Sequence, residues 1–130
     1  MKGGENKYRA VLRTESDEGS ERIIAKAERM EDGAYCIEKE GVKFRIKAET
    51  DRLLIERGGE MSYTLTLRRG QKTKVRILIS FGEVDATAGV KRMQTEERDG
   101  RLDVFCEYNL DFAGYTQYHT IHFSVKSNER

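Results

Sequence analysis

The feature that most constrains the fold of this chain is a strict alternation of apolar and polar side chains near its C-terminal end. In the stretch RLDVFCEYNLDF, residues 101–112, every second residue is apolar, and Phe105 is the one apolar residue between them. Successive side chains of a β-strand point to opposite faces, so this pattern predicts a strand with one buried and one solvated face. A short Ala-Gly turn joins it to a second predicted strand that ends at residue 126. The predicted buried face of the first strand carries Leu102, Val104, Cys106, Tyr108, Leu110 and Phe112.

Similar alternations recur in residues 42–48, 61–67 and 75–81, and glycine-containing turns separate the alternating segments at short intervals. Strands spaced in this way are typical of an antiparallel sandwich or barrel rather than of alternating strands and helices. We therefore predict an all-β, mainly antiparallel fold. The large side chains predicted to face its interior are Tyr35, Phe44, Tyr63, Phe81 and Tyr108.

Two segments, residues 21–31 and 90–98, resist this interpretation because they are rich in good helix formers. In the first, Ile23, Ala27 and Met30 follow a possible N-cap, Ser20, at helical spacing. The residues alone leave helix and strand open for both segments.

A chain of 130 residues is long enough for one compact domain with a core of its own. We predict a single β-barrel domain over residues 7–126, between flexible ends at residues 1–6 and 127–130.

The charge balance argues against a bulk electrostatic partner. The chain has 24 basic and 23 acidic residues and a net charge of +1, so no field of one sign attracts nucleic acid or an anionic membrane. No apolar run is long enough to span a bilayer, and the first residues, MKGGENK, lack the apolar core of a secretory signal. The two cysteines, Cys36 and Cys106, are therefore predicted to be reduced thiols of a cytoplasmic protein.

Residues that commonly carry catalysis or bind metals are scarce. On a strand, His119 and His122 face opposite sides and cannot share a metal ion; we predict His119 at the margin of the core and His122 in water. Neither cysteine lies beside a histidine in the sequence. We predict no metal, no cofactor and no enzymatic activity, since an active site would need Glu49, Arg57, Tyr108 or His119 to gather at one mouth of the fold.

Two rows of basic residues offer a second kind of site. Lys43, Arg45 and Lys47 share one face of a predicted strand, and Lys72, Lys74 and Arg76 share one face of another. If these strands are neighbours, the rows form a positive patch that binds phosphates. The alternative is a solvated sheet face whose lysines discourage edge-to-edge aggregation.

Arg57 and Glu49 are charged residues at the ends of predicted strands. Arg57 continues the apolar phase of Leu53 and Ile55, and Glu49 follows the strand that carries Phe44. A guanidinium at a barrel mouth requires a carboxylate partner unless it emerges into water, and the sequence leaves both arrangements open.

The order of these features resembles the YwiB-like family, uncharacterised bacterial proteins of the calycin-like β-barrel type. The resemblance covers residues 8–126: RGG at 57–59 precedes the strand MSYTLTL, Glu49 closes an early strand, SFGEV opens a late one, and EYNLDF and HTIHFSV form the closing hairpin. Ser80 and Phe81 stand where the family commonly has proline and tyrosine. The resemblance implies a closed, calycin- or lipocalin-like barrel of about eight or more strands and favours strands for both ambiguous segments. It implies no reaction.

A barrel of this size is either filled by its own side chains or holds one small ligand. The leading hypothesis is a non-enzymatic barrel that binds a small, partly apolar molecule, in a monomer or a homodimer. The alternative is an interaction module that docks a protein or nucleic acid through the basic face. The predicted ligand-binding residues are Glu49, Arg57, Tyr63, Phe81, Tyr108 and His119.

Overall fold

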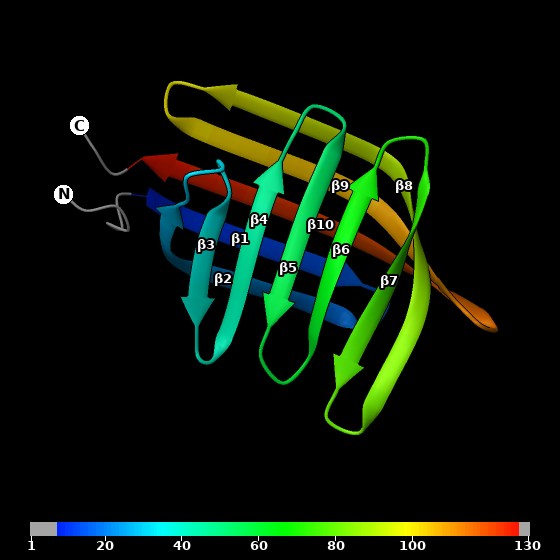
Figure 1. The fold of residues 1–130 in the computed structure, drawn as a ribbon. Helices are drawn as coiled ribbons and strands as arrows, with labels where there is room; N and C mark the ends of the chain where they lie inside the picture. The colour runs from blue at the N-terminus through cyan, green and yellow to red at the C-terminus, as the bar shows by residue number, and fades with distance from the viewer. Residues whose placement is uncertain (1–7, 128–130) are drawn as a thin grey trace.

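Ten β-strands make up most of residues 8–127, the part of the chain that this computed structural model describes (Figure 1). The predicted ends at residues 1–6 and 128–130 lie outside it, whereas Ser127, predicted in the C-terminal tail, is the last residue of a strand. The strands are β1 (Tyr8–Ser16), β2 (Gly19–Arg29), β3 (Tyr35–Lys39), β4 (Val42–Ala48), β5 (Arg52–Gly58), β6 (Ser62–Arg68), β7 (Lys72–Ile79), β8 (Gly82–Arg98), β9 (Arg101–Phe112) and β10 (Tyr115–Ser127).

Each strand pairs antiparallel with the next, and β1 pairs with β10 to close the barrel. The closing ladder runs the whole length of β1, from Tyr8 opposite Ser127 to Ser16 opposite His119. The prediction of an all-β antiparallel barrel is therefore confirmed.

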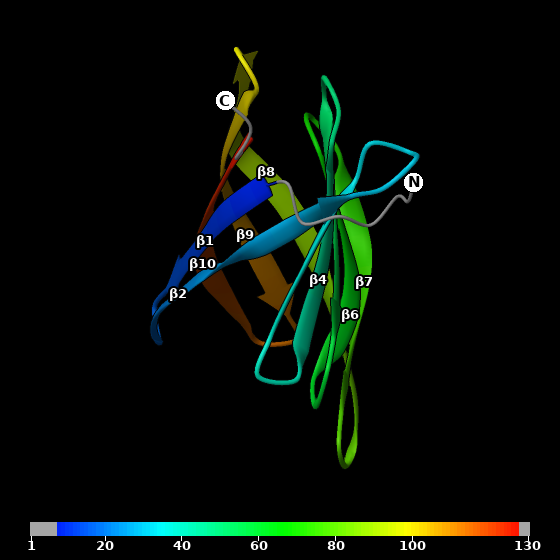
Figure 2. The ribbon, with the colours of Figure 1, turned by 90° about the vertical axis from the view of Figure 1, so that its left-hand side faces the viewer.

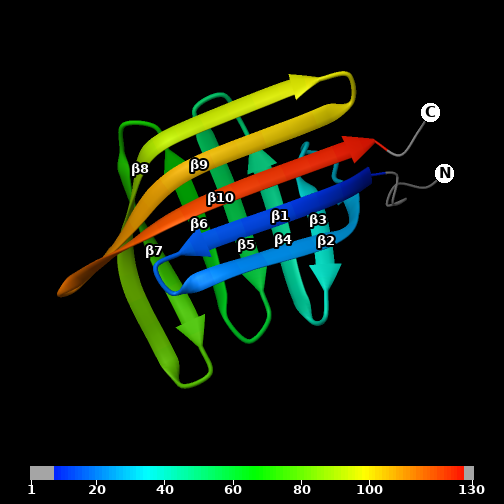
Figure 3. The same ribbon diagram turned by 180° about the vertical axis from the view of Figure 1, so that it is seen from behind.

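The barrel is flattened into two layers. Strands β3–β7 form one layer, and β1, β2, β9 and β10 form the other (Figures 2 and 3). The long strand β8 belongs to both, because its first half pairs with β7 and its second half with β9 alone. A register shift between Val90 and Arg92 marks an irregularity in β8 of the kind that bends a strand around a barrel corner.

Both ambiguous segments are strands, as the resemblance favoured. Residues 21–29 belong to β2 and residues 90–98 to β8. Each places a side chain in the core, Ala27 and Met93, and both are 1% exposed or less. Burial against neighbouring strands here outweighs the local preference for helix, which amounts to less than about 1 kcal/mol per residue.

Side chains that alternate inward fill most of the interior. Tyr35, Phe44 and Tyr108 are buried as predicted, and the described residues include no buried polar or charged side chain. The prediction for Phe81 is wrong: its side chain is 86% exposed. The alternation of β7 ends at Ile79, because the chain reverses over Ser80 and Phe81 before β8 begins.

A filled interior predicts that enlarging an inward side chain destabilises the fold. Ala88 on β8 is 1% exposed, whereas Gln94 on the same strand is exposed. We expect Ala88→Phe to lower the free energy of unfolding by about 1–3 kcal/mol because of overpacking. Gln94→Phe, measured in the same urea titration, should change it by less than about 0.5 kcal/mol. Equal effects of the two substitutions would contradict a filled interior.

Candidate functional site

The wall of the barrel is incomplete between β2 and β3. These strands form only three residue pairs, from Ala27 opposite Ile37 to Arg29 opposite Tyr35, although β2 pairs with β1 from Gly19 onward. In Figure 3 the edge of β2 borders the near layer, and the lower halves of β4–β7 extend beyond it. A hollow of about 1310 Å³ opens here. We call it the β2–β3 slot; residues 24–26, 36–39, 43–45, 56–58 and 62–64 supply most of its lining.

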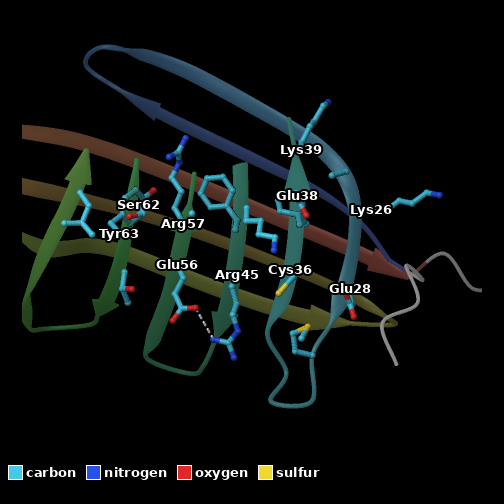
Figure 4. Close-up of a pocket in the computed structure, with 18 of the residues that line it drawn as sticks. Lys26, Glu28, Cys36, Glu38, Lys39, Arg45, Glu56, Arg57, Ser62 and Tyr63 are labelled. Carbon is cyan, nitrogen blue, oxygen red and sulfur yellow. Dashed lines mark hydrogen bonds and ion pairs between the residues drawn. The ribbon is translucent and has the colours of Figure 1, made fainter. Parts of the chain in front are cut away.

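The slot continues from the barrel interior onto the outer surface. Phe44, Arg57 and Tyr63 have the inward phase of their strands, whereas Arg45 and Glu56 have the outward phase. In Figure 4, Arg57 extends toward the side on which the β1–β2 hairpin lies, and the linked pair of Arg45 and Glu56 extends the other way. A guest in the slot would therefore meet an aromatic, partly apolar wall inside and charged side chains at the rim.

Arg57 is the central polar group of the inner wall. It pairs with Phe44 on β4, and its guanidinium carbon lies 5.7 Å from the centroid of that ring, within the range of a cation–π contact. The guanidinium also donates a hydrogen bond to the carbonyl oxygen of Met61. Within residues 8–127, Arg57 forms no ion pair with a carboxylate. Several of its N–H donors are thus available to a ligand.

Tyr63 lies beside Arg57 on the neighbouring strand β6. Burial raises the pKa of the Tyr63 phenol; Arg57 opposes this, and Glu21 of β2 adds to it. The phenol is therefore protonated at neutral pH and lines the slot as a hydroxyl group that both donates and accepts hydrogen bonds.

Glu49 does not join this group. It follows β4, and Arg52 holds it through Nη2 at 2.7 Å and Nε at 2.9 Å. Because β4 and β5 run antiparallel, this turn lies at the opposite end of the strands from Arg57, which faces Phe44. The sequence left open whether Arg57 pairs with a carboxylate or emerges into water. In the structure Glu49 pairs with Arg52 and not with Arg57.

Tyr108 and His119 form a second, separate cluster. Their rings stack with centroids 5.1 Å apart and an interplanar angle of 10°. They line a smaller hollow of about 280 Å³ with Asp17, Lys91 and Tyr118 among its other residues. Of the six predicted ligand-binding residues, the structure thus places Arg57 and Tyr63 in the β2–β3 slot and the other four elsewhere.

His119 is half-buried at the margin of the core, as predicted, and its Nε2–H donates a hydrogen bond to Gln117 Oε1 at 3.0 Å. Burial lowers the pKa of His119 below its usual value near 6.5, and the nearby carboxylates Asp17 and Glu18 oppose this shift only partly. Protonation of the ring therefore favours the unfolded chain.

This shift predicts a pH dependence of stability. A histidine with a lowered pKa in the folded state contributes stability above the unfolded pKa and loses it as the pH falls through the folded pKa. We expect the free energy of unfolding to decrease from pH 7.5 to pH 5.5, and to decrease less in His119→Gln. Chemical unfolding at the two values measures this, with His122→Gln, at an exposed position, as the control. An unchanged pH dependence in His119→Gln would contradict the assignment.

The two basic rows do not form one patch. They lie on β4 and β7, which β5 and β6 separate in the sheet. Arg45 is paired with Asp32 and Glu56. Carboxylates also neutralise parts of both rows: Lys47 lies 3.5 Å from Glu49, and Arg76 pairs with Glu83 at 2.9 Å and with Asp85 at 3.4 Å. A phosphate-binding patch required the two strands to be neighbours, and they are not.

Neither cysteine is activated as a nucleophile. Both are free thiols; burial raises the pKa of Cys106 to about 12 and also raises the pKa of Cys36, which lines the slot. Residues 8–127 contain no group of three or more His, Cys, Asp or Glu side chains placed to hold a metal ion. The same residues include no helix that is long and apolar enough to cross a membrane.

Sequence reasoning missed the β2 side of the slot, including Lys26 and the exposed Ile24. The doublet Ile23-Ile24 was an available signal, since on a strand one of two adjacent isoleucines must face outward. The extent of the β2–β3 pairing, which creates the slot, has no local signature in the sequence.

Comparisons with known proteins agree with this architecture. The family model described as "Domain of unknown function (DUF1934)" matches residues 14–125. The chain belongs to the DUF1934 family. Among solved structures, the ywiB protein from Bacillus subtilis is similar with a TM-score of 0.71 and 15% sequence identity, over 94% of this chain and 92% of that one. At this identity the likeness shows the fold alone. No curated protein matches the sequence.

Proposed function

We propose that this DUF1934 protein binds a small, partly apolar ligand that carries an anionic group, with the ligand held in the β2–β3 slot. Because the barrel core is filled, the site proposed is this opening in the wall rather than a central cavity. The anionic group would accept hydrogen bonds from Arg57, and the apolar part would lie against Phe44 and the exposed Ile24.

The observation that carries the proposal is the environment of Arg57. Its guanidinium lies over an aromatic ring on the inner wall and has no carboxylate partner within the described residues. A carboxylate or sulfonate ligand would form the charge-assisted, bidentate hydrogen bonds that a guanidinium favours. Tyr63 supplies a neutral hydroxyl beside it to fix the orientation of the ligand.

We further propose a non-enzymatic role without a cofactor, in the cytoplasm. The thiol of Cys36 has a raised pKa and is therefore a poor nucleophile at neutral pH, and the histidine of the smaller hollow lies outside the slot lining. A binding role of this kind is an analogy with calycin-like barrels, and a fold alone does not fix a function.

Anilinonaphthalene sulfonate is a suitable probe because it combines a sulfonate with aromatic rings. We expect Arg57→Gln to weaken its binding about tenfold, as for the loss of one charge-assisted hydrogen bond. Arg92→Gln is the matched control: Arg92 lies 5.2 Å from the ring of Phe105, a similar contact outside the slot. Fluorescence titration measures both, and equal affinities for the two variants would refute the role of Arg57.

Native mass spectra of the protein purified from cells, beside a denatured control, test for a natural ligand. We expect extra mass that disappears on denaturation and is reduced in Arg57→Gln. If this mass is equally abundant in Arg57→Gln, the natural ligand does not bind through Arg57.

A further inference from the structure

Most of one edge of β2 is unpaired within residues 8–127. From Gly19 to Lys26, β2 pairs with β1 on one side, and within the described residues no strand pairs with it on the other. An unpaired edge presents free N–H and C=O groups that template the addition of another strand. Figure 3 shows this edge as the lower border of the layer formed by β1, β2, β9 and β10.

The direction of the free groups follows from one contact. Lys39 Nζ lies 3.5 Å from the carbonyl oxygen of Ile24, so this carbonyl points away from β1 and into the slot. In an antiparallel ladder the N–H and C=O of one residue point to the same side, and this side alternates along the strand. The free edge therefore offers the backbone groups of Ser20, Arg22, Ile24 and Lys26.

The surroundings of the edge fit a single extended chain better than a folded body. The slot has a second wall, formed by residues of β3–β6, so the edge is approached through a hollow and not across an open plane. A strand occupies only about 5 Å in the direction of sheet pairing. A guest strand would present alternate side chains to the inner wall, where Phe44 and Arg57 lie.

The charge of the lining indicates an acidic guest. Six cationic side chains line the slot against three carboxylates, Glu28, Glu38 and Glu56. Two of the cations, Arg45 and Arg76, are already paired with carboxylates. Within residues 8–127, the cations of the slot that form no ion pair are Lys26, Lys39, Lys43 and Arg57. Two copies of this edge would bring these like charges together, which disfavours self-pairing.

We propose that the free edge of β2, residues 19–26, binds an extended acidic peptide segment of another protein, which adds a strand to the sheet and covers the β2–β3 slot. The peptide would share Arg57 with the small ligand proposed above. Unlike the small ligand, the peptide would also need the backbone groups of the β2 edge, and this difference separates the two proposals.

The test uses a nine-residue acetylated and amidated peptide of alternating threonine and valine in which one central valine is glutamate. A matched peptide carries lysine in its place. We expect the glutamate peptide to slow hydrogen exchange of the amides of Arg22 and Ile24, and the lysine peptide to bind about tenfold more weakly. The whole chain is used for both measurements.

Two variants at one position isolate the backbone contribution. Ile24→Pro removes an edge N–H and is tolerated on an unpaired edge, whereas Ile24→Ala keeps it. We expect Ile24→Pro to weaken binding of the glutamate peptide about tenfold relative to Ile24→Ala, which loses the same side chain but keeps the backbone N–H. Should Ile24→Pro fail to fold, the exchange measurement on the natural sequence decides.

Three results would overturn the proposal. The first is no protection of the β2 amides by the glutamate peptide, and the second is equal binding of the two peptides. The third is protection of these amides that rises with protein concentration alone, together with a dimer in analytical ultracentrifugation, which would assign the edge to a second copy. The two proposals can also be told apart. If Arg57→Gln loses sulfonate binding but the natural sequence binds neither peptide, the small-ligand function is retained and the peptide proposal is rejected.

Discussion

The antiparallel ladder between β1 and β10 joins the two ends of the described chain, and the rest of the architecture depends on it. Once this ladder closes the sheet, every inward side chain must share one interior, and Leu12, Phe123 and Val125 are each about 1% exposed at its centre. An open sheet of the same strands would leave two long edges exposed to pairing with other chains. Closure also forces β2 and β8 around the corners of a flattened barrel. β8 follows its corner with an irregularity in register, while β2 leaves β3 after three residue pairs.

That difference between the two corners creates the β2–β3 slot, the surface that we propose for binding. Where β2 departs from β3, Phe44, Arg57 and Tyr63 keep the inward phase of their strands but lie in the wall of an open slot. Arg57 is tolerated there because it is partly exposed and rests on an aromatic ring. An arginine one layer deeper would need a buried carboxylate, and the core contains none within residues 8–127.

The sequence predicts the strands and the all-β class well because alternation with period two is a local consequence of one buried face. It predicts the inward direction of Tyr35, Phe44 and Tyr108 for the same reason. It fails at Phe81, because alternation does not show where a strand ends and a turn begins. The sequence leaves open whether Arg57 pairs with Glu49 and whether the two basic rows join, since both depend on which strands are neighbours and in which register. Those are properties of the closed sheet, and no short stretch of the sequence encodes them.

The shortness of two ladders has a mechanical consequence. The meander β3–β6 is joined to the rest of the barrel by three residue pairs at β2 and two at β7, whereas β1, β9 and β10 are joined by ladders of nine to twelve pairs. Local opening costs least where the fewest hydrogen bonds break. Partial separation of the meander from β2 and β7 would therefore break fewer residue pairs than separation of β1, β9 and β10. Such breathing would vary the width of the slot, so a guest that bridges both walls would also stiffen the protein.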